Sequence, residues 1–287
     1  YIMIIITGEQ VQQLCDIYFG LKEDFNFNPV IKTQTNKHFQ ITTLNCDINN
    51  PYYIFCYSHR IKELSSRIHL FKNKFILITH NSDGEITKTN DILNILNCPN
   101  LDKWYAQNIR FEHIKLYLIP IGIANSQWSH GNINVFKNQQ IIHHMNNKKK
   151  FIYFNFNINT NKNKRDICFN SLKNKLEWLN MITPLENILR LSQHKFCICP
   201  EGNGCDTHRL WEALYLKTVP VVIQSDFTTA LLKRNVPLVV LNNWDDLCVS
   251  DLNYRDYDFE DSEFLKIIDF SEIILSVRCK SDNIINT

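Results

Sequence analysis

The sequence is poor in glycine, with only 7 among 287 residues, which excludes collagen-like and other glycine-rich fibrous proteins. It also lacks an excess of charge of one sign, because 31 Lys and Arg residues stand against 29 Asp and Glu residues. A chain close to neutrality offers no general basic surface, so we expect no nucleic-acid partner. Lysine-rich segments at 148–150 and 162–165 keep nucleic-acid binding open as an alternative hypothesis.

Long apolar runs and metal-type cysteine pairs are absent as well. The apolar run at residues 2–6 is far too short for a membrane span or a signal peptide, so we expect neither, and a cytoplasmic location. The ten cysteines form no C-x2-C pair and no regular framework, which favours reduced thiols over disulfides or zinc. Seven lie among apolar neighbours and are predicted to be buried: Cys15, Cys46, Cys56, Cys98, Cys168, Cys197 and Cys248.

Asn and Ile are abundant, with 35 and 37 residues, which we interpret as the coding bias of an AT-rich genome. Short apolar runs alternate with amphipathic stretches, a pattern typical of parallel α/β sheets with helices on both faces. Strands are predicted at residues 3–7, 52–57, 75–79, 118–121, 151–156, 196–199, 219–223 and 238–241. Helical or mixed segments are predicted at 11–19, 92–96, 111–116, 165–172, 185–191, 207–216, 228–233 and 264–277.

The polar segment at residues 138–150 is predicted to be a linker between two Rossmann-like lobes. We expect an N-terminal, acceptor-binding lobe at 1–145, a C-terminal lobe at 146–262 and a final helix at 263–287. Ligands of parallel sheets bind beyond the carboxyl ends of the strands. Segments that follow predicted strands, at 8–9, 79–83, 122–125 and 200–209, are therefore expected around one cleft.

The segment 196–222, FCICPEGNGCDTHRLWEALYLKTVPVV, has the pattern of strand, tight loop, helix and strand. Gly202 and Gly204 allow the backbone of the loop to approach a ligand closely. Asp206 or Thr207 can cap the following helix, whose free N–H groups favour a phosphate. The segment matches neither G-x-G-x-x-G nor the P-loop, and a plain turn is the alternative interpretation.

Two charged residues follow at the start of this helix. Arg209 lies in its first turn beside His208, and Glu212 follows on the same helix face. The arrangement suits a nucleotide, with Arg209 on the diphosphate and Glu212 accepting hydrogen bonds from ribose hydroxyls. The alternative is an exposed ion pair of little energetic value.

This segment resembles the donor-binding segment of exostosin-like glycosyltransferases, which have the motifs C-P-x-G-[ND]-G, D-[ST]-x-R-x-[WY]-E-[AT]-L and [IV]-P-[IV]-[VI]. The matching residues are Cys199, Pro200, Gly202, Asn203, Gly204, Asp206, Thr207, Arg209, Trp211, Glu212, Ala213, Leu214, Val219, Pro220, Val221 and Val222. Lys217 and Thr218 depart from the pattern, since a small residue or Gly is usual before the V-P pair. The rest of the chain is similar only in layout.

The resemblance implies a GT-B fold with a uridine diphosphate sugar in the C-terminal lobe, and a last helix, at 264–277, that crosses back to the first lobe. It implies donor contacts from Arg209 to the diphosphate and from Glu212 to the ribose. The implied donor loop also contains Gly202, Asn203, Gly204, Asp206, Thr207 and His208. Compact exostosin-like proteins without a membrane anchor resemble those that large DNA viruses of algae and protists encode. This resemblance implies a location in the host cytoplasm.

A weaker resemblance lies near the start of the chain. Thr7, Gly8 and Glu9 resemble the T-G-E of α1,3-fucosyltransferases, which share the fold, and this implies Glu9 as the catalytic base and GDP-fucose as an alternative donor. Residues 155–165 are similar to the donor-side strand and turn of that family, which implies Arg165 as a second diphosphate ligand. A solvated helix start is the alternative interpretation of Arg165.

An inverting transferase needs a base for the acceptor hydroxyl and a stabilised leaving diphosphate. Glu9 and Asp83 follow predicted strands and are the candidate catalytic bases, although Asp83 also fits a plain β-turn. His80, Trp128 and His130 are candidate acceptor-binding residues, and His130 is a third candidate base. The alternative interpretation of His130 is a solvated loop histidine, and that of Trp128 is a core tryptophan.

No metal and no other cofactor is expected. The D-x-D motif at 256–258 follows polar residues instead of an apolar strand, so we interpret it as a solvated segment. Arg209, Arg165 and the helix N-terminus would then stabilise the diphosphate. The sequence hypothesis is an inverting, metal-independent glycosyltransferase that moves a sugar, for instance xylose, from a nucleoside diphosphate to a glycan hydroxyl of a glycoprotein. A catalytically inactive nucleotide- or carbohydrate-binding protein is the alternative.

Overall fold

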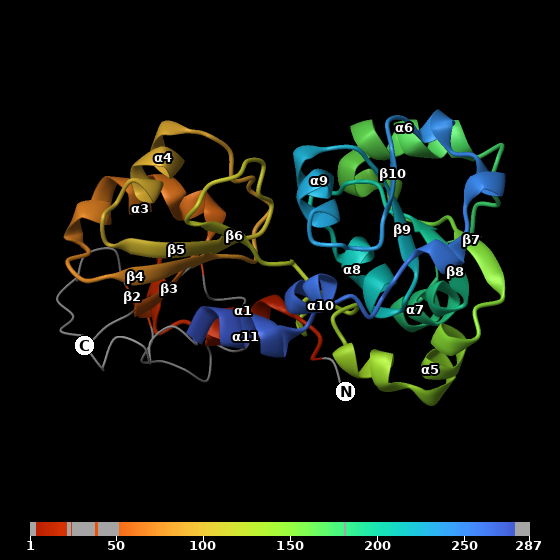
Figure 1. Ribbon diagram of the computed structural model, residues 1–287, viewed down its shortest axis with the longest axis horizontal. Helices are drawn as coiled ribbons and strands as arrows, with labels where there is room; N and C mark the ends of the chain where they lie inside the picture. Colours follow the sequence, from red (N-terminus) through yellow and green to blue (C-terminus); the bar gives the residue numbers. More distant parts are fainter. Residues whose placement is uncertain (1–3, 22–23, 25–37, 40–51, 181, 279–287) are drawn as a thin grey trace. The chain divides into compact units, whose positions relative to one another are not determined.

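The computed structural model describes residues 4–21, 24, 38–39, 52–180 and 182–278 (Figure 1). These residues form two compact units. The first unit contains the described residues up to Ile121, residues 125–127 and the chain from Asp269 onwards. The second unit contains Gly122–Ala124 and Trp128–Ile268.

The first unit is built on a parallel sheet with the strand order β2-β1-β3-β4-β5-β6. Its strands are β1 (Ile17–Phe19), β2 (His38–Phe39), β3 (Tyr52–Cys56), β4 (Phe75–Thr79), β5 (Leu101–Ala106) and β6 (Leu116–Leu118). Its helices are α1 (Gly8–Gln13), α3 (Ile61–Arg67), α4 (Asn90–Leu96) and α11 (Phe270–Arg278), with 3-10 turns at Ser58–Arg60 and Ile68–Leu70.

Helices cover both faces of this sheet. In Figure 1, α3 and α4 lie on one face, and α1 and α11 lie on the other. Leu64 of α3 packs in one core cluster with Leu77 of the sheet, while Val11 of α1 and Phe270 of α11 pack in a second cluster with Ile78. Because both faces are covered, every residue of β4 is buried, which explains its uninterrupted apolar sequence.

The second unit is built on a parallel sheet with the strand order β10-β9-β8-β7. Its strands are β7 (Lys150–Tyr153), β8 (His194–Ile198), β9 (Val219–Ile223) and β10 (Val239–Leu241). Its helices are α5 (Gln139–Asn146), α6 (Lys162–Leu172), α7 (Pro184–Ser192), α8 (His208–Tyr215), α9 (Asp226–Leu232) and α10 (Ser262–Ile268). Its 3-10 turns are Ile133–Lys137, Ile158–Asn161, Trp244–Asp246, Val249–Asp251 and Tyr254–Asp256.

The predicted α/β class with two parallel sheets is confirmed, and the arrangement is compatible with two Rossmann-like lobes. Strands β4 and β9 have the predicted bounds, and β3, β8 and β10 lie within two residues of theirs. These strands are short, apolar and flanked by turn residues, which is the clearest strand pattern a sequence can carry.

The predicted first strand at residues 3–7 is wrong. Ile4 to Ile6 belong to no strand, and the backbone of Ile4 instead contacts the end of the chain. The Ile4 N–H donates to the carboxylate of Asp269 at 3.1 Å, and its carbonyl accepts from the N–H of Phe270 at 2.8 Å. Of residues 4–6, only Ile6 is buried, in the core cluster that contains Val11 of α1 and Phe270 of α11, while Ile4 is 43% exposed. The apolar sequence alone therefore did not distinguish a strand from a segment that packs in this core without joining the sheet.

The predicted helix at 11–19 is wrong in its second half, since α1 ends at Gln13 and residues 17–19 form β1. Strand β5 was not predicted, because Asp102 and Lys103 interrupt its apolar pattern. No helix forms at 111–116, and the strand predicted at 118–121 is β6, which begins and ends earlier, at Leu116–Leu118.

The predicted linker at 138–150 is also wrong, because it contains α5. The Asn138 side chain caps this helix by accepting from the N–H of Gln140 at 2.9 Å, and Ile141 is fully buried. The second unit therefore begins well before the predicted boundary at residue 146.

The predicted helix at 264–277 is interrupted at Asp269. The carboxylate of this buried residue accepts hydrogen bonds from the N–H and the hydroxyl of Ser271, at 2.9 and 2.7 Å, and thereby starts α11 as a separate helix. Helix α10 belongs to the second unit, whereas α11 belongs to the first, where Phe270 and Ile273 enter the core.

The described cysteines are all free thiols. Burial is confirmed for Cys15, Cys56, Cys98, Cys168 and Cys197, whereas Cys46 lies outside the described residues. Cys248 is exposed, contrary to the prediction, because it lies in a chain of short 3-10 turns. In the described part of the chain, no helix combines the length and apolarity needed to cross a membrane.

Candidate functional site

The loop between β8 and α8 is largely buried and follows the carboxyl end of its strand, as predicted. The N–H of Gly202 donates to the carbonyl of Gly204 at 3.2 Å, which closes a tight turn, while Asn203 between them is exposed. Asp206 is buried and accepts a hydrogen bond from the indole N–H of Trp211, whose ring is fully buried. Asp206 therefore anchors α8 on the loop.

Thr207 is the N-cap residue of α8, but its side chain accepts no capping hydrogen bond. The backbone of Thr207 is extended, with φ −126° and ψ 142°, and the residue is buried. The first turn of α8 is thus left without the side-chain acceptor that Ser, Thr, Asp or Asn usually provides. That this N-terminus binds a phosphate stays a prediction from the sequence.

Arg209 and Glu212 form a buried ion pair instead of the exposed pair considered as an alternative. The Arg209 Nε atom donates to the Glu212 carboxylate at 3.0 Å, and these side chains are 17% and 8% exposed. Burial opposes the charge of Arg209, yet the Glu212 carboxylate next to it keeps the pKa of the guanidinium above its usual value.

The other nitrogens of Arg209 are also held by the protein. Nη1 donates to the carbonyl of Asn155 at 2.6 Å, and Nη2 donates to the side-chain oxygen of Asn187 at 3.1 Å. The guanidinium also lies over the ring of Tyr153, with 5.6 Å between the Cζ atom and the ring centroid. Asn187 in turn accepts from the Tyr153 hydroxyl at 2.8 Å, so the position of Arg209 is fixed before any ligand binds.

Arg165 of α6 is the second candidate diphosphate ligand, and it is buried, with 8% of its surface exposed. Its Nε donates to the carbonyl of Glu201 at 3.0 Å, and Nη1 donates to the carbonyl of Asn157 at 2.7 Å. Burial, and then the like charge of Arg209, lower the pKa of Arg165 to about 10. The alternative interpretation of Arg165 as a solvated helix start is wrong.

Arg165 has no carboxylate partner among the residues that the structure describes. The nearby carboxylate of Glu201 pairs with Lys164 instead. A Cβ atom at Gly202 would lie 3.4 Å from Nη2 of Arg165, so the glycine is next to that nitrogen. The site therefore combines a buried cation without a carboxylate partner among the described residues, a glycine beside it, and a helix whose N-cap residue makes no side-chain cap.

The segment after β7 holds both arginines through its backbone. The carbonyl groups of Asn155 and Asn157, two residues apart, accept from Arg209 and Arg165 respectively. Sequence reasoning missed these two residues and Asn187. Asn187 lies inside the amphipathic helix α7, where Asn is unfavourable unless its side chain has a role. Its position was therefore a usable sequence signal for a functional side chain.

Aromatic side chains lie beside His208, the first residue of α8. Nδ1 of His208 lies 2.8 Å from the carbonyl of Gly122, and its ring packs edge-on against His130, with centroids 6.3 Å apart. His130 stacks with Trp128 at 6.5 Å, and Trp128 is 56% exposed. The predicted acceptor-binding residues Trp128 and His130 thus belong to the second unit, not to the first lobe.

In the first unit, Thr7 and Gly8 have structural roles. Thr7 caps α1 in a capping box with Gln10. A Cβ atom at Gly8 would lie 1.5 Å from the side-chain oxygen of Asn81, so no larger residue fits there without rearrangement. Glu9 is half-buried, and its Oε1 accepts from the N–H and the hydroxyl of Ser126 at 2.8 and 2.7 Å.

His80 and Asp83 both follow β4, but one is buried and the other is exposed. His80 is fully buried, with Nε2 2.8 Å from the carbonyl of Pro120 and Nδ1 3.4 Å from the side-chain oxygen of Asn81. Asp83 is exposed. Asn81 also accepts from the side-chain amide of Asn125 at 3.2 Å, so an amide network links the loops after β4 and β6.

The D-x-D segment is exposed at both acids, as predicted. Asp256 accepts from the side chain of Asn253 at 2.7 Å, and Asp258 accepts from the N–H of Glu260 at 2.8 Å. Within the described ranges, no group of three or more His, Cys, Asp or Glu side chains is arranged to hold a metal ion.

No protein-family model matches this chain, and no curated protein matches it significantly. The assignment of roles to the residues above therefore rests on their chemistry and geometry alone.

Proposed function

We propose that the second unit binds a nucleoside diphosphate sugar and that the protein transfers the sugar to a glycan hydroxyl with inversion. The observation that carries this proposal is the buried guanidinium of Arg165, which has no carboxylate partner in the described chain and lies beside Gly202 at the carboxyl edge of the sheet. Ligands of parallel α/β sheets bind at this edge.

A diphosphate fits the charge of this site. Two arginines are held on the same backbone segment, and the charge of Arg209 adds to burial in lowering the pKa of Arg165. A buried cation without a counter-ion is costly, and a phosphate that pairs with it recovers that cost through short, charge-assisted hydrogen bonds. The N-terminus of α8 adds backbone N–H groups and a partial positive charge. These groups would stabilise the leaving diphosphate without a metal ion.

The two arginines would have different parts in this reaction. Arg165 supplies the unpaired charge, whereas Arg209 is already neutralised by Glu212 and keeps the site in shape. One oxygen of Glu212 remains for a ribose hydroxyl, as the exostosin-like pattern implies. We favour a uridine diphosphate sugar and keep GDP-fucose as the alternative donor.

In the first unit, we assign the base role to Glu9. Ser126 holds Oε1 by two hydrogen bonds, which fixes the carboxylate, while Oε2 has no hydrogen-bond partner among the described residues. Oε2 would take the proton of the acceptor hydroxyl. A GT-B arrangement, a cytoplasmic location and glycoprotein glycans as acceptors are parts of the same proposal.

The test is a nucleotide-release screen over UDP-, GDP- and dTDP-sugars, with and without a chelator. We expect release from at least one donor, undiminished by chelator, and abolished in Arg165→Met. Glu9→Gln should retain nucleotide binding but lose transfer to an acceptor. Nucleotide binding without release from any donor would favour the inactive binding protein, and absence of both would overturn the proposal.

A further inference from the structure

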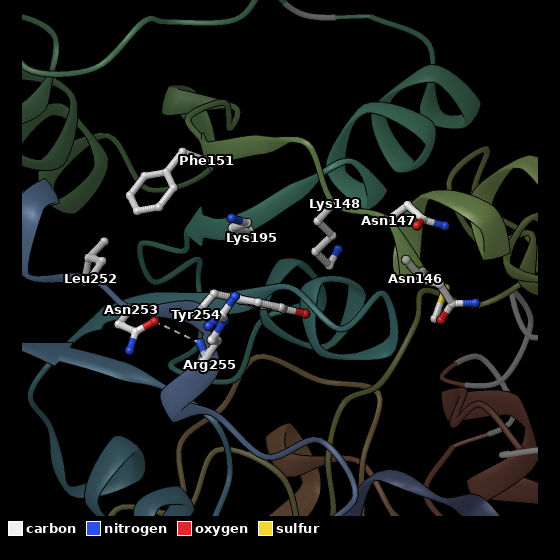
Figure 2. A pocket seen from close by; sticks show the side chains of 10 residues that line it. Asn146, Asn147, Lys148, Phe151, Lys195, Leu252, Asn253, Tyr254 and Arg255 are labelled. Carbon is white, nitrogen blue, oxygen red and sulfur yellow. Dashed lines mark hydrogen bonds between the residues drawn. The ribbon is translucent and has the colours of Figure 1, made fainter.

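The second unit contains a pocket of about 370 Å³ that is separate from the proposed donor site (Figure 2). Lys148 lies two residues before β7, Phe151 is the second residue of β7, and Lys195 is the second residue of β8. The donor loop follows the opposite, carboxyl ends of these strands. Tyr254 and Arg255, from the 3-10 turn Tyr254–Asp256, complete the polar and aromatic part of the lining.

The lining contains three cationic side chains and no acidic one. Lys148 Nζ donates to the carbonyl of Ser192 at 2.9 Å and to the hydroxyl of Thr218 at 2.8 Å, and both of these acceptors are uncharged. Burial lowers the pKa of the Lys148 ammonium group to about 7, as expected for a cation without a counter-ion. The lining is therefore short of negative charge.

The two other cations of the pocket are also unpaired. In the described part of the chain, neither Lys195 nor Arg255 makes an ion pair. Asp256 is adjacent to Arg255 in sequence, but its carboxylate accepts from Asn253 and does not line the pocket. Figure 2 shows the three cationic side chains around one hollow.

Two aromatic rings give the pocket apolar walls. Tyr254 is fixed, because its hydroxyl donates to the carbonyl of Lys217 and its ring packs edge-on against Phe196, with centroids 6.2 Å apart. The ammonium of Lys195 lies 6.0 Å from the centroid of the Phe151 ring. A bare inorganic ion would leave these rings uncovered, whereas a small organic molecule would contact them. The volume lies within the range of small-molecule sites.

We propose that this pocket is a second ligand site, which binds a phosphorylated small molecule such as a sugar phosphate. The phosphate group would pair with Lys195 and Arg255, close to the buried Lys148 amine, and the organic body would lie against Phe151 and Tyr254. This site does not depend on the proposed transferase activity, because it lies at the other end of the strands and shares no residue with the donor loop.

The experiment is calorimetric titration of the whole chain with glucose 6-phosphate, with glucose and inorganic phosphate as comparison probes. We expect saturable binding of glucose 6-phosphate, weaker binding of phosphate and none of glucose. Arg255→Gln and the double variant Lys195→Gln with Arg255→Gln should weaken binding by about tenfold and more than tenfold, because each removes a charge-assisted hydrogen bond. Lys137→Gln, at an exposed lysine outside the pocket, is the matched control and should bind like the wild type.

Arg165→Met separates this proposal from the proposed function. Unchanged binding of glucose 6-phosphate in Arg165→Met supports the second site, whereas loss of binding places the phosphate at the donor loop and overturns it. Absence of binding to the wild type, or equal binding by the double variant, also overturns the proposal. Circular dichroism of each variant checks that it is folded.

Discussion

Gly202 lies directly beside Nη2 of Arg165. A Cβ atom at position 202 would lie 3.4 Å from that nitrogen and 3.5 Å from the methyl group of Thr207. These are ordinary van der Waals distances, so the packing around Gly202 does not itself require glycine. In the proposed function, the missing side chain lets a phosphate oxygen reach the buried guanidinium.

Gly202→Ala should therefore reduce ligand affinity more than stability. The backbone at Gly202 is not in the left-handed region, so Ala can adopt it, and we expect the free energy of unfolding to change by less than about 1 kcal/mol. The methyl group would occupy the approach to Nη2, and affinity for UDP should fall by about tenfold. Calorimetry and urea unfolding of the same variant measure both effects. Unchanged UDP affinity would show that no ligand enters there.

Glu212→Gln should destabilise the second unit. It leaves the buried Arg209 without its carboxylate, and we expect a loss of about 2–4 kcal/mol in the free energy of unfolding, measured by denaturant titration. The matched control is Glu263→Gln, which removes an exposed pair of the same i,i+3 spacing with Lys266 and should cost less than about 0.5 kcal/mol. Equal effects of the two substitutions would contradict the buried-pair interpretation.

The stability of the protein should decrease in mild acid because of His194. This ring is 4% exposed, and Nδ1 lies 2.7 Å from the carbonyl of Arg190. Burial, and then the charges of Lys150 and Lys148, lower the pKa of His194 to about 4. Between that value and the ordinary value of about 6.5, the unfolded chain binds a proton that the folded chain does not.

Stability from this group is therefore present above about pH 6.5 and lost as the pH falls towards 4, by up to about 3 kcal/mol. Unfolding titrations of the wild type and His194→Gln between pH 7 and 4 measure this contribution. The difference between them should change with pH in that window. A difference independent of pH would mean that His194 is protonated alike in both states.

Much of the fold follows from local patterns in the sequence. Val219–Ile223 was predicted with its observed bounds, because four β-branched apolar residues lie between turn signals, with Pro220 as the one residue unsuited to a strand in the middle of a sheet. Failures occurred where a single polar residue decides the structure. Asp269 divides a continuous amphipathic pattern into α10 and α11, and Asn138 starts a helix in the polar segment that was predicted to be a linker.

Asparagine has a larger role than coding bias suggests. Among the residues that the structure describes, four non-glycine residues have positive φ, and three of them are Asn81, Asn108 and Asn235, at φ 59°, 54° and 56°. Asn tolerates this left-handed region better than other residues except glycine, which is scarce in this chain. The fourth is Lys217, at φ 53°, one of the two residues that depart from the exostosin-like pattern.

The candidate site could be predicted only in part. The motif identified the loop and both charged residues of α8, but it could not show that Arg209 is already neutralised within the protein. Nor could the motif show that Arg165 has no carboxylate partner among the described residues. Arg165 is held by the carbonyl of Glu201, which lies 36 residues further along the sequence. The difference between the two arginines depends on whether a carboxylate contacts each guanidinium, and tertiary packing decides these contacts.

The most direct test of the account is the binding of UDP and GDP to Arg165→Met, measured by calorimetry beside the wild type. Lys164→Met, which removes the neighbouring exposed lysine of the same helix, is the matched control. We predict that Arg165→Met weakens binding of the preferred nucleotide by about 30-fold or more, because a buried charge-assisted contact is lost, while Lys164→Met changes it little. Equal affinity of Arg165→Met and the wild type would contradict the account.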